Sequence, residues 1–340
     1  MAKPASVALR ALWATTKEKI SQNIKNSLIQ NNGLLYEIKE KGGLLEVESG
    51  GREFNEPAIV GDSAAVGGIT RSQTLNVDDQ EGIDAFLYTP RIFYGTTHLF
   101  TTDLAMNAGE GRALSLLKAR IEQTKESVNN GLDVYLCGRN NDAAGAHTDA
   151  ESGTQVGWLG LQNIIPDTAT QDIPGTGVSK TTYTKARSAV VTTACASNAA
   201  WNTANAGRAI VQALYNGCRQ GANAPNLLLT TRTIWDAFQI SLQANERFSN
   251  AGGQDAKVGY PALTYMANCR VTWGDNVLAG HMYALNTKFL KFKVLAEANW
   301  KMGDFIECYD AFREVAKLLI MGQLQISGPK FCGVYTGAAF

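Results

Sequence analysis

The sequence predicts an α/β fold of the mixed α+β kind, and three observations lead to that prediction. A largely apolar stripe recurs three and four positions apart from Leu114 to Val128, which indicates a long amphipathic helix over residues 110–131. Residues 226–247 have the pattern of a buried strand that leads directly into a helix. The tail from residue 286 onward is mostly strand-like.

Composition favours a protein that packs against copies of itself. The chain has 340 residues, of which only 18% are charged, against about 25% in an average soluble protein. Its 31 basic and 31 acidic residues cancel to a net charge of zero. This balance argues against the basic field of a general nucleic-acid binder, and it removes the charge repulsion that keeps soluble proteins apart.

Residues 1–43 are expected to form an N-terminal arm. Seven basic and three acidic residues give its first 41 positions a net charge of +4. Apolar residues from Trp13 to Leu28 fall near one face of a helix. A basic amphipathic helix can bind a membrane surface, but this apolar face is thin. We therefore expect an arm that docks on protein.

Residues 44–90 are expected to form a long β-hairpin that projects from the body, and we call this segment the extended loop. Between Glu46 and Asp84 it carries nine acidic residues and two arginines, a net charge of −7. Its short β-like pieces are separated by Gly, Pro, Asn and Asp, and its apolar residues are too few to bury both faces of a sheet. Because an isolated two-stranded ribbon is only marginally stable in water, it needs another surface to lie on.

The remaining elements follow from capping and periodicity. Residues 138–157 form a polar loop, and a helix over 197–219 is expected to begin at a Ser197 cap. A second helix is predicted over 232–247, directly after the strand that precedes it. In the strand-like tail, the apolar run 315–321 is expected to be the most buried piece.

No catalytic, cofactor-binding or metal-ligating residues are predicted. The six cysteines are scattered, with no pair closer than 23 positions, so a zinc site is not expected. The string 174–181 lacks the ending of a phosphate-binding loop, and the three histidines match no catalytic motif. No run approaches the ~20 apolar residues of a membrane span, and the N-terminus does not have the pattern of a signal peptide, so we expect intracellular synthesis. A soluble α/β enzyme that uses the loop region 139–157 is the alternative from another class.

Five strings, taken in chain order, resemble one family over about the whole chain. They are FNEP at 54–57, GEG at 109–111 before the long helix, GLQNII at 160–165, NLLL at 226–229 and LNTKFLKF at 285–292. In this order they resemble the major capsid protein of tailed bacteriophages, which has the Hong Kong 97-type fold. The collinearity of the strings carries the resemblance, because each string alone is weakly specific.

The resemblance implies a shell subunit and not an enzyme. Hexamers and pentamers would form an icosahedral shell around packaged double-stranded DNA, without sequence-specific binding, in a virion assembled in the host cytoplasm. A scaffolding protein and a portal are expected partners, a decoration protein is left open, and no membrane or cofactor is involved. The implied parts are an N-terminal arm (1–43), the extended loop (44–90), a peripheral domain (91–158 and 286–340, with a spine helix at 110–131) and an axial domain (159–285).

The oppositely charged arm and extended loop are predicted to meet between subunits. The alternative, that the arm faces inward toward DNA or a scaffold, is left open. The predicted interface residues are Arg10, Lys17, Lys19 and Lys25 in the arm, and Glu46, Glu48, Glu53, Glu56, Arg71, Asp78, Asp79 and Glu81 in the loop.

Two departures from the founding member of the family bear on assembly. That phage cross-links its shell by isopeptide bonds from a loop lysine to a neighbour's asparagine, but residues 42–117 here contain no lysine. We therefore expect a shell without such cross-links. The arm is also not preceded by a long scaffold-like segment, so a separate scaffolding protein is expected unless this sequence is already processed. The alternative function is the shell of an encapsulin-type nanocompartment, which shares the fold but encloses enzyme cargo.

Overall fold

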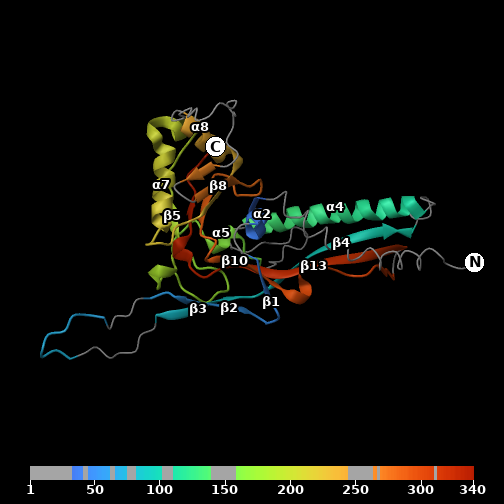
Figure 1. Cartoon of the computed structure of the whole chain (residues 1–340), viewed down its shortest axis with the longest axis horizontal. Helices are drawn as coiled ribbons and strands as arrows, with labels where there is room; N and C mark the ends of the chain where they lie inside the picture. Colours follow the sequence, from blue (N-terminus) through green and yellow to red (C-terminus); the bar gives the residue numbers. More distant parts are fainter. Residues whose placement is uncertain are drawn as a thin grey trace, which may run out of the picture.

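A computed structural model gives the arrangement of most of the chain. The residues that it describes are 33–40, 45–61, 66–74, 82–101, 110–138, 158–243, 263–265, 269–309 and 312–340. Figure 1 shows an elongated peripheral part, an upright axial part and a ribbon that points away from both. Most of the arm and the polar loop 139–157 lie outside the described residues.

The peripheral part is a six-stranded sheet built around one long strand, β13 (Arg313–Ile326). Along one edge β13 pairs antiparallel with β4 (Arg91–Phe100) over ten residue pairs. Along its other edge it pairs with three shorter strands, and the outermost strand pairs parallel with the first of these. These strands are β10 (Leu290–Leu295), β11 (Lys301–Met302), β12 (Ile306–Glu307) and, outermost, β1 (Leu45–Glu48).

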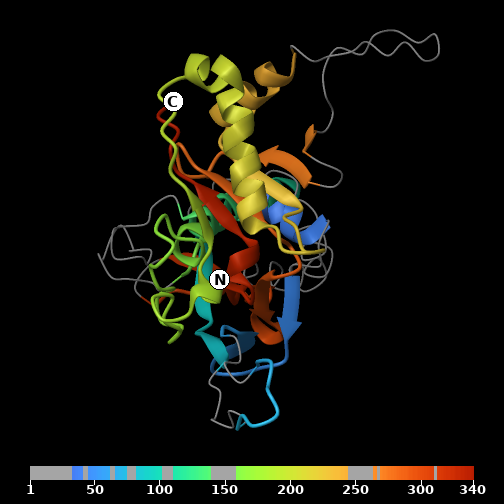
Figure 2. The same cartoon turned by 90° about the vertical axis from the view of Figure 1, so that its left-hand side faces the viewer.

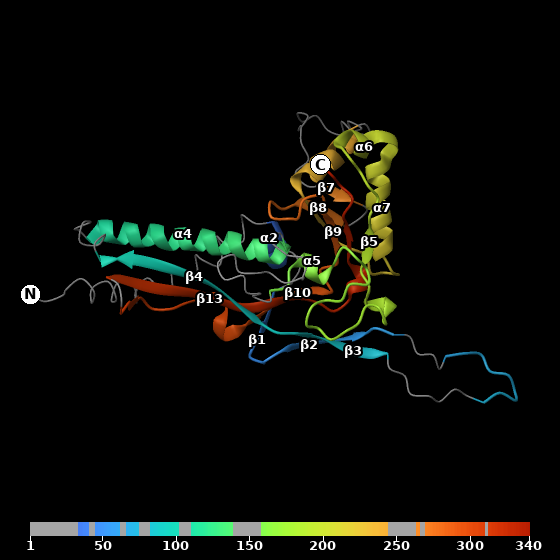
Figure 3. The same ribbon diagram turned by 180° about the vertical axis from the view of Figure 1, so that it is seen from behind.

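The spine helix, α4 (Glu110–Cys137), runs along β4, as Figure 3 shows from behind. The approach is close because a Cβ at Gly95 would overlap the Val128 side chain. The helix is six residues longer than the predicted 110–131. Its apolar stripe continues through Leu132 and Leu136, which are fully buried, and the chain leaves the helix at Gly138 with a φ of 75°.

The axial part is a second six-stranded sheet with helices packed on it. Figure 2 shows α7 standing upright against this part. The strand order is β5 (Ala189–Val191), β14 (Gly333–Tyr335), β9 (Met282–Leu285), β6 (Leu227–Thr230), β8 (Cys269–Trp273) and β7 (Leu263–Tyr265). The helices are α6 (Asn198–Asn202), α7 (Ala206–Cys218) and α8 (Arg232–Gln243). Because β14 pairs with β9 and β5, the end of the chain belongs to this sheet, and the prediction that all of 286–340 is peripheral is wrong there.

Two further expectations need correction. The helix predicted over 197–219 does begin at Ser197, whose hydroxyl accepts a 3.2 Å hydrogen bond from Ala200 N, but it breaks into two helices at Asn205, where φ is 59°. In β13 the most buried stretch is 322–326 and not 315–321. The earlier stretch alternates between a face toward α4 and an open face, whereas the later one is covered on both faces.

Short elements complete the chain. The helix α2 (Gly33–Glu40) contacts α4, and α5 (Leu161–Ile164) follows the polar loop. The ribbon consists of β2 (Phe54–Ile59) and β3 (Ile83–Tyr88), which pair antiparallel, so the predicted hairpin is confirmed at its base. The 3₁₀ turns are η1 (Thr184–Ala186), η2 (Thr203–Asn205), η3 (Ala296–Ala298) and η4 (Pro329–Phe331).

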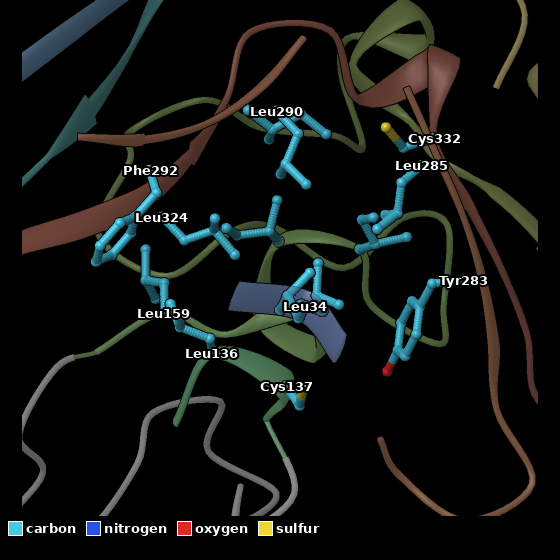
Figure 4. Packing of buried hydrophobic residues seen from close by; sticks show 14 of the residues in the cluster. Leu34, Leu136, Cys137, Leu159, Tyr283, Leu285, Leu290, Phe292, Leu324 and Cys332 are labelled. Atoms are coloured by element: carbon cyan, nitrogen blue, oxygen red, sulfur yellow. The ribbon is translucent and has the colours of Figure 1, made fainter. Parts of the chain in front are cut away.

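One hydrophobic core joins the two sheets. Figure 4 shows Leu34 of α2 and Leu136 of α4 in one cluster with Leu285 of the axial sheet and Leu324 of the peripheral sheet. All four side chains are almost completely buried. Because the same cluster contains residues of both sheets, the axial and peripheral parts are held in one orientation by packing.

Polar contacts of α2 and α4 reinforce this junction. Asn276, in the turn between β8 and β9, donates a 2.7 Å hydrogen bond to the buried carboxylate of Asp133 on α4. Glu37 of α2 forms an ion pair with Arg270 of β8. Burial raises the pKa of Asp133 to about 6, against the opposing effect of hydrogen bonds from Asn276 and from the Leu35 backbone.

The raised pKa of Asp133 makes the stability of the subunit depend on pH. The folded pKa lies above the ordinary 3.8, so the stabilisation by protonated Asp133 is complete below pH 3.8 and is lost as the pH rises through about 6. A shift of this size corresponds to about 3 kcal/mol. We measure the free energy of unfolding in urea on unassembled subunits. The value for D133N minus the value for the wild type should increase as the pH rises from 4 to 7, because only the wild type loses stability through Asp133. A difference that does not change with pH would contradict this prediction.

Candidate assembly surfaces

The base of the extended loop is held by a buried lysine. Lys293 of β10 has only 9% of its side chain exposed, and its ammonium lies 2.5 Å from Glu56 and 3.4 Å from Glu48. Glu46 is 3.9 Å away and also accepts a 2.9 Å contact from Lys291. We call these five residues the lysine cluster. It connects β10 of the body with β1 and β2, which lead into the loop.

Strand register explains how the lysine cluster forms. Parallel pairing of β1 with β10 places Glu46 beside Lys293. The hydrogen bond from Lys291 lowers the pKa of Glu46, although partial burial opposes it. Burial works to lower the pKa of Lys293, but its bonds to Glu56 and the charges of the glutamates outweigh burial and raise it. Both shifts favour the charged forms, so the cluster is an ionic clamp.

The predicted interface residues fall into three groups in the structure. Glu46, Glu48 and Glu56 lie at the base of the loop and have cationic partners in the same chain. Glu53 and Arg71 are exposed. The other seven, Arg10, Lys17, Lys19, Lys25, Asp78, Asp79 and Glu81, lie outside the described residues. Their role between subunits stays a prediction, because all four predicted arm residues are in this last group.

Sequence reasoning missed Lys291 and Lys293. They alternate with buried residues in the strand LKFKVL, and a lysine within an apolar strand is a signal that a buried acidic partner is needed. The parallel register of β1 and β10, which brings the partners together across the length of the chain, could not be read from the sequence.

The inner face of the ribbon is anchored to the body. Phe54 of β2 and Phe86 and Tyr88 of β3 are buried in the main core. The Tyr88 hydroxyl donates a 3.0 Å hydrogen bond to the carbonyl of Ile326 and accepts one from the amide of the same residue. The inner face and the lysine cluster therefore fix the direction in which the ribbon leaves the molecule.

The outer face of the ribbon is apolar and uncovered. The register pairs Pro57 with Ala85 and Ile59 with Ile83, and the alternation of strand side chains turns both pairs away from the body. Ile59 is 72% exposed and Ile83 is 79% exposed, and Leu87 adds to the same face. Contiguous exposed apolar residues of this kind mark an interaction surface.

Beyond the ribbon, residues 66–74 lie far from the body, as Figure 1 shows. Val66 and Ile69 are exposed, and Gln73 N donates a 3.1 Å hydrogen bond to the Thr70 carbonyl across a turn. Within the described part of the chain, the side chains of Val66 and Ile69 are therefore left uncovered.

A second apolar surface lies on the open face of the peripheral sheet. A groove of about 680 Å³ has an apolar floor, and charged side chains line its rim. The floor includes Leu295, Ile306, Val315, Leu319 and Met321, and the rim includes Glu297, Lys301, Asp304, Glu307 and Lys317. At the outer end of the sheet, Phe100, Tyr309 and Phe312 are exposed.

Within the described residues there is no group of three or more His, Cys, Asp or Glu side chains placed to hold a metal ion. The described helices also include none that is long and apolar enough to span a bilayer. All six cysteines are free, and five are buried.

Removing the buried ammonium should destabilise the subunit by leaving three glutamates without their shared partner. We expect K293M to lose about 3 kcal/mol of unfolding free energy at neutral pH, whereas K291M, at a half-exposed position, should lose about 1 kcal/mol or less. The deficit of K293M should shrink at acid pH as the glutamates become protonated. Urea denaturation of unassembled subunits measures both variants, and equal losses would show that Lys293 is not the clamp.

No protein-family model and no curated protein matches the chain. Solved structures are similar to it over nearly their full length. The capsid asymmetric unit of cyanophage A-1(L) has a TM-score of 0.60 at 16% identity, covering 93% of this chain and 95% of that one. The capsid of an empty GTA particle has a TM-score of 0.54 at 14% identity, with 87% of each chain covered. The capsid of Myoviridae phage XM1 has a TM-score of 0.52 at 14% identity, covering 91% and 93%.

At these identities the likeness concerns the fold. It extends over 87–95% of this chain and of each of these neighbours. The chain therefore has the Hong Kong 97-type fold of tailed-phage capsid proteins.

Proposed function

We propose that the chain is a major capsid protein that self-assembles into hexamers and pentamers, and that these close an icosahedral shell around double-stranded DNA. The observation that carries the proposal is the ribbon, which is anchored by one face and apolar on the other. In a subunit with a capsid fold, such a ribbon is suited to lie on an adjacent copy. The role is structural and not enzymatic, and the shell would be part of a virion.

The geometry of the ribbon favours ring formation. We infer that its outer face, with the exposed Ile59 and Ile83, meets a different surface on the neighbour, which makes the contact heterologous. Heterologous contacts between identical chains generate closed rings when the rotation closes. Small changes in this one contact would allow rings of either five or six copies. An icosahedral shell requires one chain to form both kinds of ring.

Further partners belong to the same proposal. A scaffolding protein and a portal would be partners in assembly in the host cytoplasm, as the resemblance implies. DNA would be enclosed without sequence-specific contacts, consistent with the zero net charge of the chain. Nuclease-resistant DNA in purified particles would support the proposal that the shell encloses DNA. Particles that hold only protein cargo would contradict it.

Charges on the outer face of the ribbon should block assembly without unfolding the subunit. The variant I59K/I83D places an ammonium opposite a carboxylate on a face that is exposed in the single chain. Because unlike charges at a cross-strand pair do not repel, its melting temperature should match that of the control I59V/I83V. Burying each isoleucine contributes about 1.5–3 kcal/mol, so the concentration needed for assembly should rise at least about 100-fold. Mass photometry of both variants checks this, and equal assembly would contradict the proposed contact.

Shells of this protein should lack isopeptide cross-links through the extended loop, because residues 42–117 contain no lysine. Boiling purified particles in denaturant should give one band at the 36.6 kDa of the single chain. A ladder of multimers that survives boiling and reduction would show covalent cross-links and contradict the expectation.

A further inference from the structure

A long connection joins α5 to β5 over residues 166–188, and we call it the strap. It contains no helix or strand apart from the 3₁₀ turn η1, and its apolar residues Ile173, Val178 and Ala186 are buried in the main core. Figure 3 shows the strap between the axial part and the ribbon. Because the strap is irregular, its position depends on a few individual contacts with the elements around it.

The middle of the strap is bonded to the ribbon. The carbonyl of Thr176 accepts a 3.3 Å hydrogen bond from the amide of Leu87 in β3. Since this amide cannot also face β2, the bond lies on the other edge of β3. Thr176 is buried, and both its amide and its hydroxyl donate to the carbonyl of Ile173. A shift of the strap therefore changes how the base of the ribbon is held.

The start of the strap is held by a histidine. His281 lies directly before β9, and its side chain is 11% exposed. Its Nε2 atom lies 3.2 Å from a carboxylate oxygen of Asp167, the second residue of the strap. Its Nδ1 atom lies 2.8 Å from the carbonyl oxygen of Ala279. One imidazole ring thus ties the strap to the axial sheet.

The turn that carries His281 is fixed in place. The carbonyl of His281 accepts a 3.2 Å hydrogen bond from the Thr230 hydroxyl of β6. Gly280 has a φ of 74°, and a Cβ at this position would overlap the carbonyl of Ala338. Because this backbone is held on two sides, breaking the bond to Asp167 leaves the histidine where it is and frees the strap.

Both ring nitrogens of His281 face hydrogen-bond acceptors. A neutral imidazole has one N–H donor and one lone pair, so it bonds to only one of these acceptors, whereas an imidazolium donates to both. If the neutral ring keeps its proton on Nδ1, the lone pair of Nε2 faces the carboxylate of Asp167. Burial works to lower the pKa of His281, but the bonds to Asp167 and Ala279 outweigh burial and raise it above the ordinary 6.5.

The titratable groups around the ring come from three elements. Asp167 belongs to the strap, and the Tyr283 ring of β9 stacks on the imidazole with centroids 6.1 Å apart. Cys137, at the end of α4, acts electrostatically on Tyr283. Burial raises the pKa of Tyr283 and that of Cys137, so both groups stay neutral while His281 titrates. Asp167 is therefore the charged partner on which the titration of His281 acts.

We propose that His281 is a pH-sensitive latch, which holds Asp167 and the strap when it is protonated and releases them when it is neutral. Because the pKa is raised, the stabilisation is complete below pH 6.5 and is lost as the pH rises through the folded value. Release makes the bond between Thr176 and Leu87 open more often. The latch belongs to the single subunit, and only its consequence for assembly, a ribbon held less firmly at higher pH, rests on the proposed self-assembly.

An NMR titration of the imidazole protons tests the pairing. The chain has three histidines, and the signal missing from H281Q belongs to His281. We expect a midpoint above 6.5 in the wild type and one lower by about 0.5 pH units or more in D167N. The control D172N changes another strap carboxylate, which accepts the Lys180 amide, and should leave the midpoint unchanged. A midpoint of 6.5 or below, or equal midpoints for D167N and wild type, would overturn the proposal.

Hydrogen exchange links the latch to the ribbon. Protection factors, which are corrected for the direct effect of pH on exchange, are compared at pH 5.5 and pH 8.5. The protection of the Leu87 amide should fall about tenfold or more in wild-type subunits and stay level in H281Q. The Phe86 amide faces β2 by strand alternation, so it should keep its protection in both proteins.

Two other groups titrate in this range, but both proteins share them. Burial raises the pKa of Asp133 to about 6 and lowers that of Lys180 to about 8. The difference between wild type and H281Q therefore isolates His281, and an equal loss of Leu87 protection in both, or no loss in the wild type, would contradict the latch.

The variant D167N repeats the exchange test at a position whose side chain is 40% exposed, so it does not depend on the folding of H281Q. Its Leu87 protection should also stay level, and a loss as large as that of the wild type would contradict the latch. All these measurements use unassembled subunits. A protein that forms no shells would therefore contradict the proposed function and not the latch.

Discussion

The charge of Lys293 is the constraint on which the extended loop depends. A buried ammonium is costly unless it is paired and hydrogen-bonded. Its partners Glu48 and Glu56 come from β1 and β2, the two strands that lead into the loop. Pairing therefore holds the base of the loop against β10. Together with the buried apolar side chains of the ribbon, it fixes the direction in which the ribbon leaves the body.

The direction of the ribbon determines which apolar surfaces of the subunit stay uncovered. With one face of the ribbon buried and the other uncovered, the subunit is complete as a fold but carries apolar surface that a single copy does not cover. Within the described residues the peripheral sheet has two uncovered features, an apolar groove on its open face and the edge of β4 that does not pair with β13. The core that joins the two sheets keeps these features at fixed positions relative to the ribbon, so a contact made by one copy sets the position of the next.

Local patterns predicted the elements better than their ends or partners. The spine helix, the Ser197 cap and the projecting hairpin were readable because periodicity, capping and turn residues act within a few positions. The extra turns of α4 depend on burial of Leu136 in a core that is assembled from distant segments. The break at Asn205 and the placement of β14 in the axial sheet likewise depend on contacts between segments that are distant in the sequence.

The candidate site shows the same limit. The sequence indicated an acidic loop that needs a partner, but seven of its nine acidic residues were assigned to contacts between subunits. Three of them are paired within the chain because a parallel strand register, which leaves no local signature, brings Lys293 to the base of the loop. The uncovered apolar face of the ribbon was missed for a related reason, since the register of β2 with β3 decides which side chains point outward.

Electron cryo-microscopy of the purified protein tests the central claim most directly, because it shows both the particle and the path of the loop. The account predicts closed shells of hexamers and pentamers, with the ribbon of each subunit leaving its clamp at Lys293 and lying on an adjacent copy. Monomers or small open oligomers at high concentration, or shells in which the ribbon contacts only its own subunit, would contradict it.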